Sequence, residues 1–177
     1  MIDPFTHPGA APRIFQETAW CLVGRPVSVL FSSNGLGERL GEFIWEDPEN
    51  SSITVRPGLT EELTYRAFLH ECAHARLDWP FAGKPDKDLT KRIERAMNGA
   101  DRGLEADRLK NLYGGVISRM ENAADELAAR WDEAAVTALG HAAPYTKRLE
   151  WLRNASYQNP FFVEYPPATA EEGQLND

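Results

Sequence analysis

The sequence predicts a single α+β domain in which a small three-stranded sheet packs on a central helix and the C-terminal half is helical. The chain has 177 residues, a length that suits one compact domain with a sizeable core. Before residue 56, short apolar runs alternate with polar residues and are separated by turn-forming residues, which is typical of strands. After residue 60, apolar residues recur at steps of three and four, which is typical of helices.

We expect this domain to span residues 12–157. Segment 1–11 has neither hydrophobic periodicity nor a targeting pattern, and we interpret it as disordered or as a remnant of an expression vector. Segment 158–177 is rich in proline and then acidic, so we expect it to be a flexible tail.

The composition excludes several classes of function. A net charge of −8 argues against direct binding of nucleic acid, which needs clustered lysine and arginine. No run approaches the roughly 18 apolar residues needed to cross a bilayer, so no membrane partner is expected. The chain has only two cysteines, Cys21 and Cys72, and no apolar signal at its start. We therefore predict a cytoplasmic protein without disulfides, in which both cysteines act as small buried apolar residues.

The first half of the chain contains one helix and three short strands. Pro12 at a helix start and Gly24 just past its end frame an amphipathic helix. Strands are expected at 27–31, 43–45 and 53–55, because these runs are apolar or alternate in polarity. The last two strands are separated by turn-forming residues and should form an antiparallel hairpin.

The central helix is predicted to begin after Thr60, whose side chain can cap it, and to carry two histidines on an apolar face. After it we expect a loop over 80–88, a short helix over 89–97 and a helical segment over 104–113. Gly114 and Gly115 should then interrupt the helical pattern, as a hinge or as a helix end.

Two further helices complete the predicted fold. The first is long and amphipathic and follows the glycine pair, with apolar residues recurring from 117 to 135. Glu121 and Asp125 border its apolar face. Small residues nearby, including Ala124, would let this helix approach the histidine helix closely. The last helix is expected over 145–157.

The most informative motif is His-Glu-Cys-Ala-His, which begins at His70 and ends at His74. Residues four apart are neighbours on a helix, so both imidazoles can reach one zinc ion. Glu71 lies one residue round the helix, where it can take a proton from a water molecule polarised by the metal and pass it to a leaving amine. The motif therefore predicts peptide hydrolysis.

A catalytic zinc site needs a third protein ligand, which we expect on a separate element. Glu121 is the candidate, because Asp125 lies one turn on and could accept the second ring proton of a ligand histidine. Glu126 and Asp132 are competing carboxylates on the same helix.

A carboxylate pair in the order Glu-x-x-x-Asp, downstream of His-Glu-x-x-His, resembles the arrangement in thermolysin-like zincins. The order of a helix, three strands, the motif helix and a helix with Glu-Asn-Ala-Ala-Asp-Glu-Leu-Ala is similar to the ImmA/IrrE family of metallopeptidases. The similarity spans roughly residues 12–140. Leu127 stands where the family frequently has phenylalanine, and no helix-turn-helix is attached.

This resemblance implies a minimal zincin-like fold in which His70, His74 and Glu121 hold Zn²⁺. It also implies that Glu71 is the catalytic base and that Asp125 orients a ligand histidine. The family members act inside the cell on a regulatory protein, often a repressor. We therefore expect a zinc-dependent endopeptidase whose partner is a protein substrate, with a separately encoded repressor as the implied target.

Several alternatives stay open at the level of sequence. Cys21 could supply the third ligand, as an upstream cysteine does in peptide deformylases, although its neighbours lack their glycine-rich context. The chain could be a non-catalytic protein of the zincin fold that sequesters a partner as an antirepressor or inhibitor, or a metal-free helical scaffold. Tyr113, His141 and Tyr145 are available to stabilise an oxyanion, but their spacing selects none of them.

Overall fold

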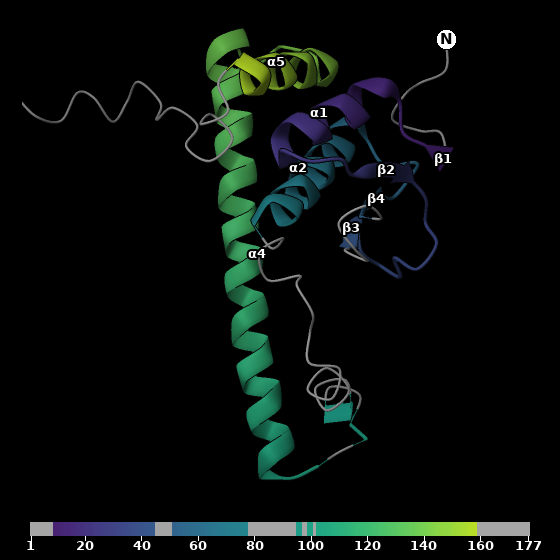
Figure 1. The fold of residues 1–177 in the computed structure, drawn as a ribbon, viewed down its shortest axis with the longest axis vertical. Helices are drawn as coiled ribbons and strands as arrows, with labels where there is room; N and C mark the ends of the chain where they lie inside the picture. Colours follow the sequence, from purple (N-terminus) through teal and green to yellow (C-terminus); the bar gives the residue numbers. More distant parts are fainter. Residues whose placement is uncertain (1–8, 45–50, 78–94, 97–98, 101, 159–177) are drawn as a thin grey trace, which may run out of the picture.

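The structure, a computed structural model, is an α+β fold of mostly helical content (Figure 1). It describes residues 9–44, 51–77, 95–96, 99–100 and 102–158. The strands in these ranges are β1 (Gly9–Ala10), β2 (Ser28–Phe31), β3 (Gly41–Ile44) and β4 (Ser52–Val55). The helices are α1 (Arg13–Val23), α2 (Glu61–Leu77), α4 (Leu104–Leu139) and α5 (Tyr145–Gln158).

The helices are arranged so that α2 lies at the centre of the fold. On one side α2 contacts the strands β3 and β4, and on the other side it packs against α4. The helix α1 contacts α2, β2 and α5, so that it closes the end of the core (Figure 1). With 36 residues, α4 is about 54 Å long, and its N-terminal part extends well beyond the other elements (Figure 1). None of the helices among the described residues has the length and apolar character needed to span a membrane.

The first helix ends where the sequence predicts. Pro12 precedes α1, and Gly24 follows it with a φ of 76°. This left-handed conformation suits glycine, and it lets the Gly24 N–H donate to the Trp20 carbonyl. The apolar face of α1 is fully buried, as its periodicity indicates.

The sheet contains four strands in the order β1-β2-β4-β3. The predicted antiparallel pairing of the second and third strands is confirmed by β3 and β4, while β2 and β4 run parallel. The predicted count of three strands is wrong, because Gly9–Ala10 pairs antiparallel with β2. A two-residue strand is too short to produce an alternating pattern, and it lies in the segment 1–11 that the prediction left outside the domain. Residues 1–8 and 159–177 lie outside the described residues.

The predicted interruption at the glycine pair is wrong. Gly114 and Gly115 lie inside the continuous helix α4, and neither has a positive φ. A glycine within a helix costs about 1 kcal/mol relative to alanine, which is too little to end a helix that packing holds along its C-terminal half. The predicted loop over 80–88 lies outside the described residues, and so does most of the predicted helix over 89–97.

The hydrophobic core lies between the sheet and the helices. The ring of Phe15 meets the rings of Phe31 and Phe68 edge-on, with centroids 5.2 and 5.0 Å apart. From α4, Trp131 is fully buried in the same cluster. Cys72 is buried as predicted, whereas Cys21 is only half-buried. The histidine helix is therefore held on three sides by apolar contacts, which fixes the direction in which its histidines point.

We predict that replacing Gly115 with alanine stabilises the protein by up to about 1 kcal/mol, because alanine loses less conformational freedom in a helix. Residue 115 is exposed, and an added Cβ would meet no atom within 4 Å. Urea unfolding of Gly115→Ala and the wild type measures the difference. A clear loss of stability would contradict the continuous helix.

Candidate metal centre

The two histidines of the motif lie on the side of α2 that faces α4. Thr60 caps this helix as predicted, since its hydroxyl accepts a hydrogen bond of 3.2 Å from the Leu63 N–H. One helical turn separates His70 from His74, and their Nε2 atoms are 3.0 Å apart. The spacing of the motif therefore brings both rings to one point, as the sequence indicates.

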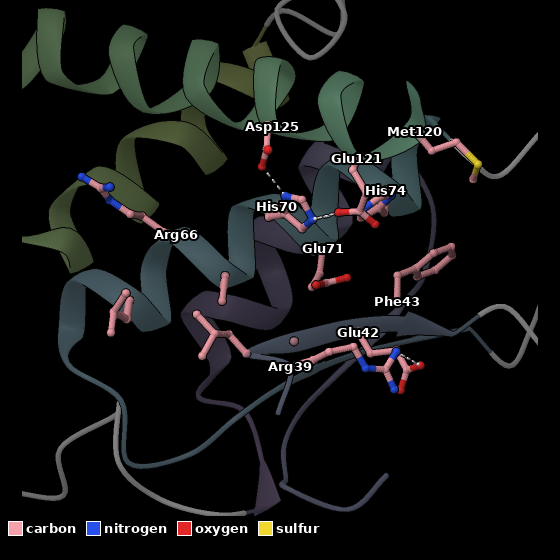
Figure 2. A pocket seen from close by; sticks show the side chains of 14 residues that line it. Arg39, Glu42, Phe43, Arg66, His70, Glu71, His74, Met120, Glu121 and Asp125 are labelled. Atoms are coloured by element: carbon pink, nitrogen blue, oxygen red, sulfur yellow. Dashed lines mark hydrogen bonds and ion pairs between the residues drawn. The ribbon is translucent and has the colours of Figure 1, made fainter. Parts of the chain in front are cut away.

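The helix α4 supplies the carboxylates that complete this cluster. Glu121 places one carboxylate oxygen 3.2 Å from the His70 Nε2 and the other 3.4 Å from the His74 Nε2. Figure 2 shows Glu121 and Asp125 pointing from α4 towards the two rings. Between them, Ala124 is fully buried, and its small side chain allows α4 to lie close to α2. The predicted set of His70, His74 and Glu121 is thus brought together, with its ligand atoms all within 4.8 Å of one another.

The hydrogen bond of His70 with Asp125 fixes the chemistry of the cluster. The His70 Nδ1 is 2.8 Å from a carboxylate oxygen of Asp125. Because an ionised carboxylate only accepts, we assign the ring proton to Nδ1, which leaves a lone pair on Nε2 facing Glu121. A lone pair and a carboxylate oxygen 3.2 Å apart repel each other unless a cation or a proton lies between them. Two imidazoles and a carboxylate are also a ligand set of catalytic zinc sites, so these residues fit a divalent metal.

Glu71 lies beside this cluster but in a different environment. Its side chain is only 7% exposed and is enclosed between α2 and the strand β3 (Figure 2). Burial raises the pKa of Glu71 to about 7, against the opposing effects of the neighbouring His70 and His74 and of a hydrogen bond from the Phe43 N–H. A carboxyl group with this pKa can both accept and release a proton near neutral pH.

The strand β3 contributes two residues that the sequence analysis missed. Phe43 donates its backbone N–H to Glu71, and Gly41 lies directly against the Glu71 side chain. A backbone donor leaves no trace in the sequence. The signal for Gly41 was a glycine next to a predicted strand, which often marks a close approach of the backbone to another group.

The three candidate metal ligands line a cleft of about 620 Å³ between β3, α2 and α4. The strand β3 is an edge strand of the sheet, so it forms one wall of this cleft. Exposed or half-exposed apolar side chains border it, namely Leu40, Leu63 and Met120. The cleft is therefore partly apolar, with the polar groups of the histidine cluster in its lining.

The competing ligands are not in the cluster. Among the described residues, Cys21 is not part of any group that could hold a metal ion. Glu126 forms an ion pair of 2.7 Å with Arg130, and Asp132 forms one of 3.0 Å with Arg148. These pairs give each competing carboxylate a partner of its own.

The candidates for oxyanion stabilisation do not line the metal cleft in the described part of the chain. His141 and Tyr145 instead line a second cavity of about 630 Å³ between α2, α4 and α5. The two cavities share His70 and Asp125, so the second cavity adjoins the metal cleft. The side chain of Tyr113 lies outside the described residues.

Comparison with protein-family models, with curated proteins and with solved structures found no match for this chain. The resemblance to the ImmA/IrrE family therefore rests on the two motifs and on the order of the elements that carry them.

We predict that Asp125→Ala weakens zinc binding by about 10- to 100-fold, because the His70 ring loses the acceptor that fixes its tautomer. Competition with a chromophoric chelator at neutral pH measures this affinity. The matched control is Glu126→Ala, the next residue on the same helix, which is exposed and paired with Arg130. An unchanged affinity in Asp125→Ala would contradict the role of the hydrogen bond with His70.

We also predict that, in the metal-free protein, the contribution of Glu71 to stability falls as the pH rises from about 4.5 to about 7. In this range the folded state keeps a proton on Glu71 that the unfolded state releases, since the pKa is raised from 4.5 to about 7 on folding. Above pH 7, Glu71→Gln should be more stable than the wild type by up to about 3 kcal/mol. Urea unfolding of both proteins with a chelator at pH 5 and pH 8 tests this. If the stability difference between Glu71→Gln and the wild type is the same at pH 5 and pH 8, the raised pKa of Glu71 is ruled out.

Proposed function

We propose that this protein is a zinc-dependent endopeptidase of the ImmA/IrrE type that hydrolyses a peptide bond in a protein substrate. The observation that carries the proposal is the position of Glu71, a buried carboxyl beside two histidines and a third ligand, at the wall of an open cleft. A site that only stores a metal has no need of such a group next to its ligands.

In this proposal His70, His74 and Glu121 hold the zinc ion. When bound, zinc supplies a Lewis acid that polarises a carbonyl group and lowers the pKa of water. Asp125 accepts the Nδ1–H of His70, so the Nε2 lone pair of the ring is free to bind the metal and faces the other two ligands, His74 and Glu121.

Glu71 acts as the base and then as the acid. Its carboxylate takes a proton from the attacking water as the new C–O bond forms, and it gives that proton to the nitrogen when the C–N bond breaks. In the metal-free protein the pKa of Glu71 is about 7, so neither protonation state of this carboxyl group is strongly disfavoured near neutral pH. The hydrogen bond from the Phe43 N–H keeps the carboxyl group at the wall of the cleft.

The shape of the cleft favours an extended polypeptide over a small substrate. Its wall is the edge strand β3, and backbone groups alternate in direction along a strand. Phe43 directs its N–H away from β4 and towards Glu71. Because this direction repeats at every second residue, Gly41 also directs its backbone groups to the outer side of the sheet. A peptide can pair with such an edge as an additional strand.

The resemblance to ImmA/IrrE peptidases suggests that the substrate is a repressor encoded elsewhere. The net charge of −8 is consistent with a separate DNA-binding protein as the substrate, because the chain itself is poorly suited to bind DNA. By cleaving a separate DNA-binding protein, this chain would act on gene regulation without contacting DNA.

We expect Glu71→Gln to retain zinc and to lower cleavage by about 10²- to 10⁴-fold, because the general base is lost while the ligands stay. The assay is incubation of the zinc-loaded protein with a proteome-derived peptide library, followed by mass spectrometry of the new termini. Glu126→Gln on the surface of α4 is the control with unchanged cleavage.

Two results would contradict the proposal. Cleavage by Glu71→Gln at the wild-type rate would exclude Glu71 as the base. Absence of cleavage by both proteins, together with full biological effect of Glu71→Gln in cells, would favour a partner-binding protein that keeps the metal site without using it for hydrolysis.

A further inference from the structure

The strand β3 makes an unusually close contact with Glu71 at Gly41. A Cβ atom added to Gly41 would lie 2.8 Å from the Glu71 Cγ and 3.0 Å from its Oε1. It would also lie 3.1 Å from the carbonyl oxygen of Thr54 on β4. Carbon atoms that are not bonded pack at about 3.5 to 4.0 Å, so an alanine at position 41 requires something to move.

The glycine at this position is required by space and not by backbone conformation. Gly41 is not among the described glycines that have a positive φ, so a residue with a side chain could adopt its backbone angles. Among the other described glycines, an added Cβ has a neighbour within 4 Å only at Gly24. That neighbour is the guanidinium end of Arg76, which can move aside more easily than the buried Cγ of Glu71.

Neither partner of this contact can easily move away. Gly41 lies opposite Val55 in the ladder between β3 and β4, and its neighbour Leu40 accepts a hydrogen bond of 2.8 Å from the Arg56 N–H, which holds this end of β3 in place. Glu71 is 7% exposed and also accepts a hydrogen bond from the Phe43 N–H on the same strand. A side chain at position 41 would therefore either push the Glu71 carboxylate out of place or separate β3 from α2.

We propose that Gly41 is a positioning residue for Glu71. Because Gly41 has no side chain, β3 can pack closely against the Glu71 carboxylate and hold it in place. This inference rests on the proposed function, since it assigns Gly41 to the base of that reaction. The three atoms nearest to a Cβ at position 41 belong to Glu71 and Thr54 and to no metal ligand, so Gly41 acts by holding the carboxylate beside the two histidines. The contact also explains why a strand at the sheet edge contains a glycine, which is otherwise unfavourable there.

The contact itself is tested by thermal unfolding of four full-length proteins with a chelator, namely the wild type, Gly41→Ala, Glu71→Ala and the double variant. We expect Gly41→Ala to lower the Tm of the wild type by about 5 °C. In the Glu71→Ala background the loss should be less than half as large, because the Cγ and the carboxylate are gone and only the Thr54 carbonyl remains close. An equal loss in both backgrounds would overturn the proposal. If Gly41→Ala alone does not fold, folding of the double variant supports the contact, and failure of both overturns it.

The positioning role is tested with the zinc-loaded protein and a peptide from the library that the wild type cleaves. Gly41→Ala should lower kcat by at least about tenfold, since small displacements of a catalytic group reduce rates strongly. Zinc affinity and KM should stay within about twofold, because no ligand is altered. Gly115→Ala, with open space around its Cβ, is the control with unchanged kinetics. An unchanged kcat in Gly41→Ala would overturn the positioning role.

The two experiments separate the failure of this inference from the failure of the proposed function. If the wild type cleaves no peptide, the endopeptidase proposal fails and the positioning role fails with it, while the unfolding cycle still reports whether Gly41 and Glu71 are in contact. If the wild type cleaves and the cycle shows no coupling, only the inference about Gly41 fails.

Discussion

The close packing of α4 on α2 is the constraint on which the rest of this structure depends. It is made possible by the buried Ala124, and it brings the carboxylates of Glu121 and Asp125 to two histidines that lie some fifty residues earlier in the chain. A larger side chain at residue 124 would separate the helices and leave the two imidazoles with no third ligand. The candidate metal site is therefore a property of the helix packing as much as of the candidate ligands themselves.

The strand β3 encloses the same site from the opposite side. It buries the carboxyl group of Glu71, while those of Glu121 and Asp125 stay exposed. Glu121, with its side chain 52% exposed, and Asp125 lie at the open side, where they interact with the imidazoles. Glu71 is buried against β3, and that burial raises its pKa to about 7. Three acidic residues close together can thus take different roles, as a ligand, an orienting acceptor and a base, because their surroundings differ.

Features encoded by neighbouring residues could be predicted from the sequence, and features encoded by packing could not. The helix spacing of His70 and His74 and the Gly24 helix end are local, so their positions were predicted correctly. Several acids on the same helix compete with Glu121 in the sequence, and the Asp125 partner one turn on favours Glu121, which the structure brings close to both imidazoles. The two-residue strand β1 and the role of Gly41 depend on which segments meet in space, which periodicity does not reveal. Gly114 and Gly115 predict an interruption, but a long packed helix tolerates both glycines without one.

X-ray absorption spectroscopy of the zinc-loaded protein identifies the atoms that surround the metal, and so it tests whether His70, His74 and Glu121 bind it. We expect a first coordination shell of nitrogen and oxygen at about 2.0 to 2.2 Å, with the scattering pattern of two imidazoles and no sulfur. Loss of one oxygen neighbour in Glu121→Ala would agree with that assignment. A sulfur neighbour at about 2.3 Å, or an unaltered spectrum in Glu121→Ala, would contradict it.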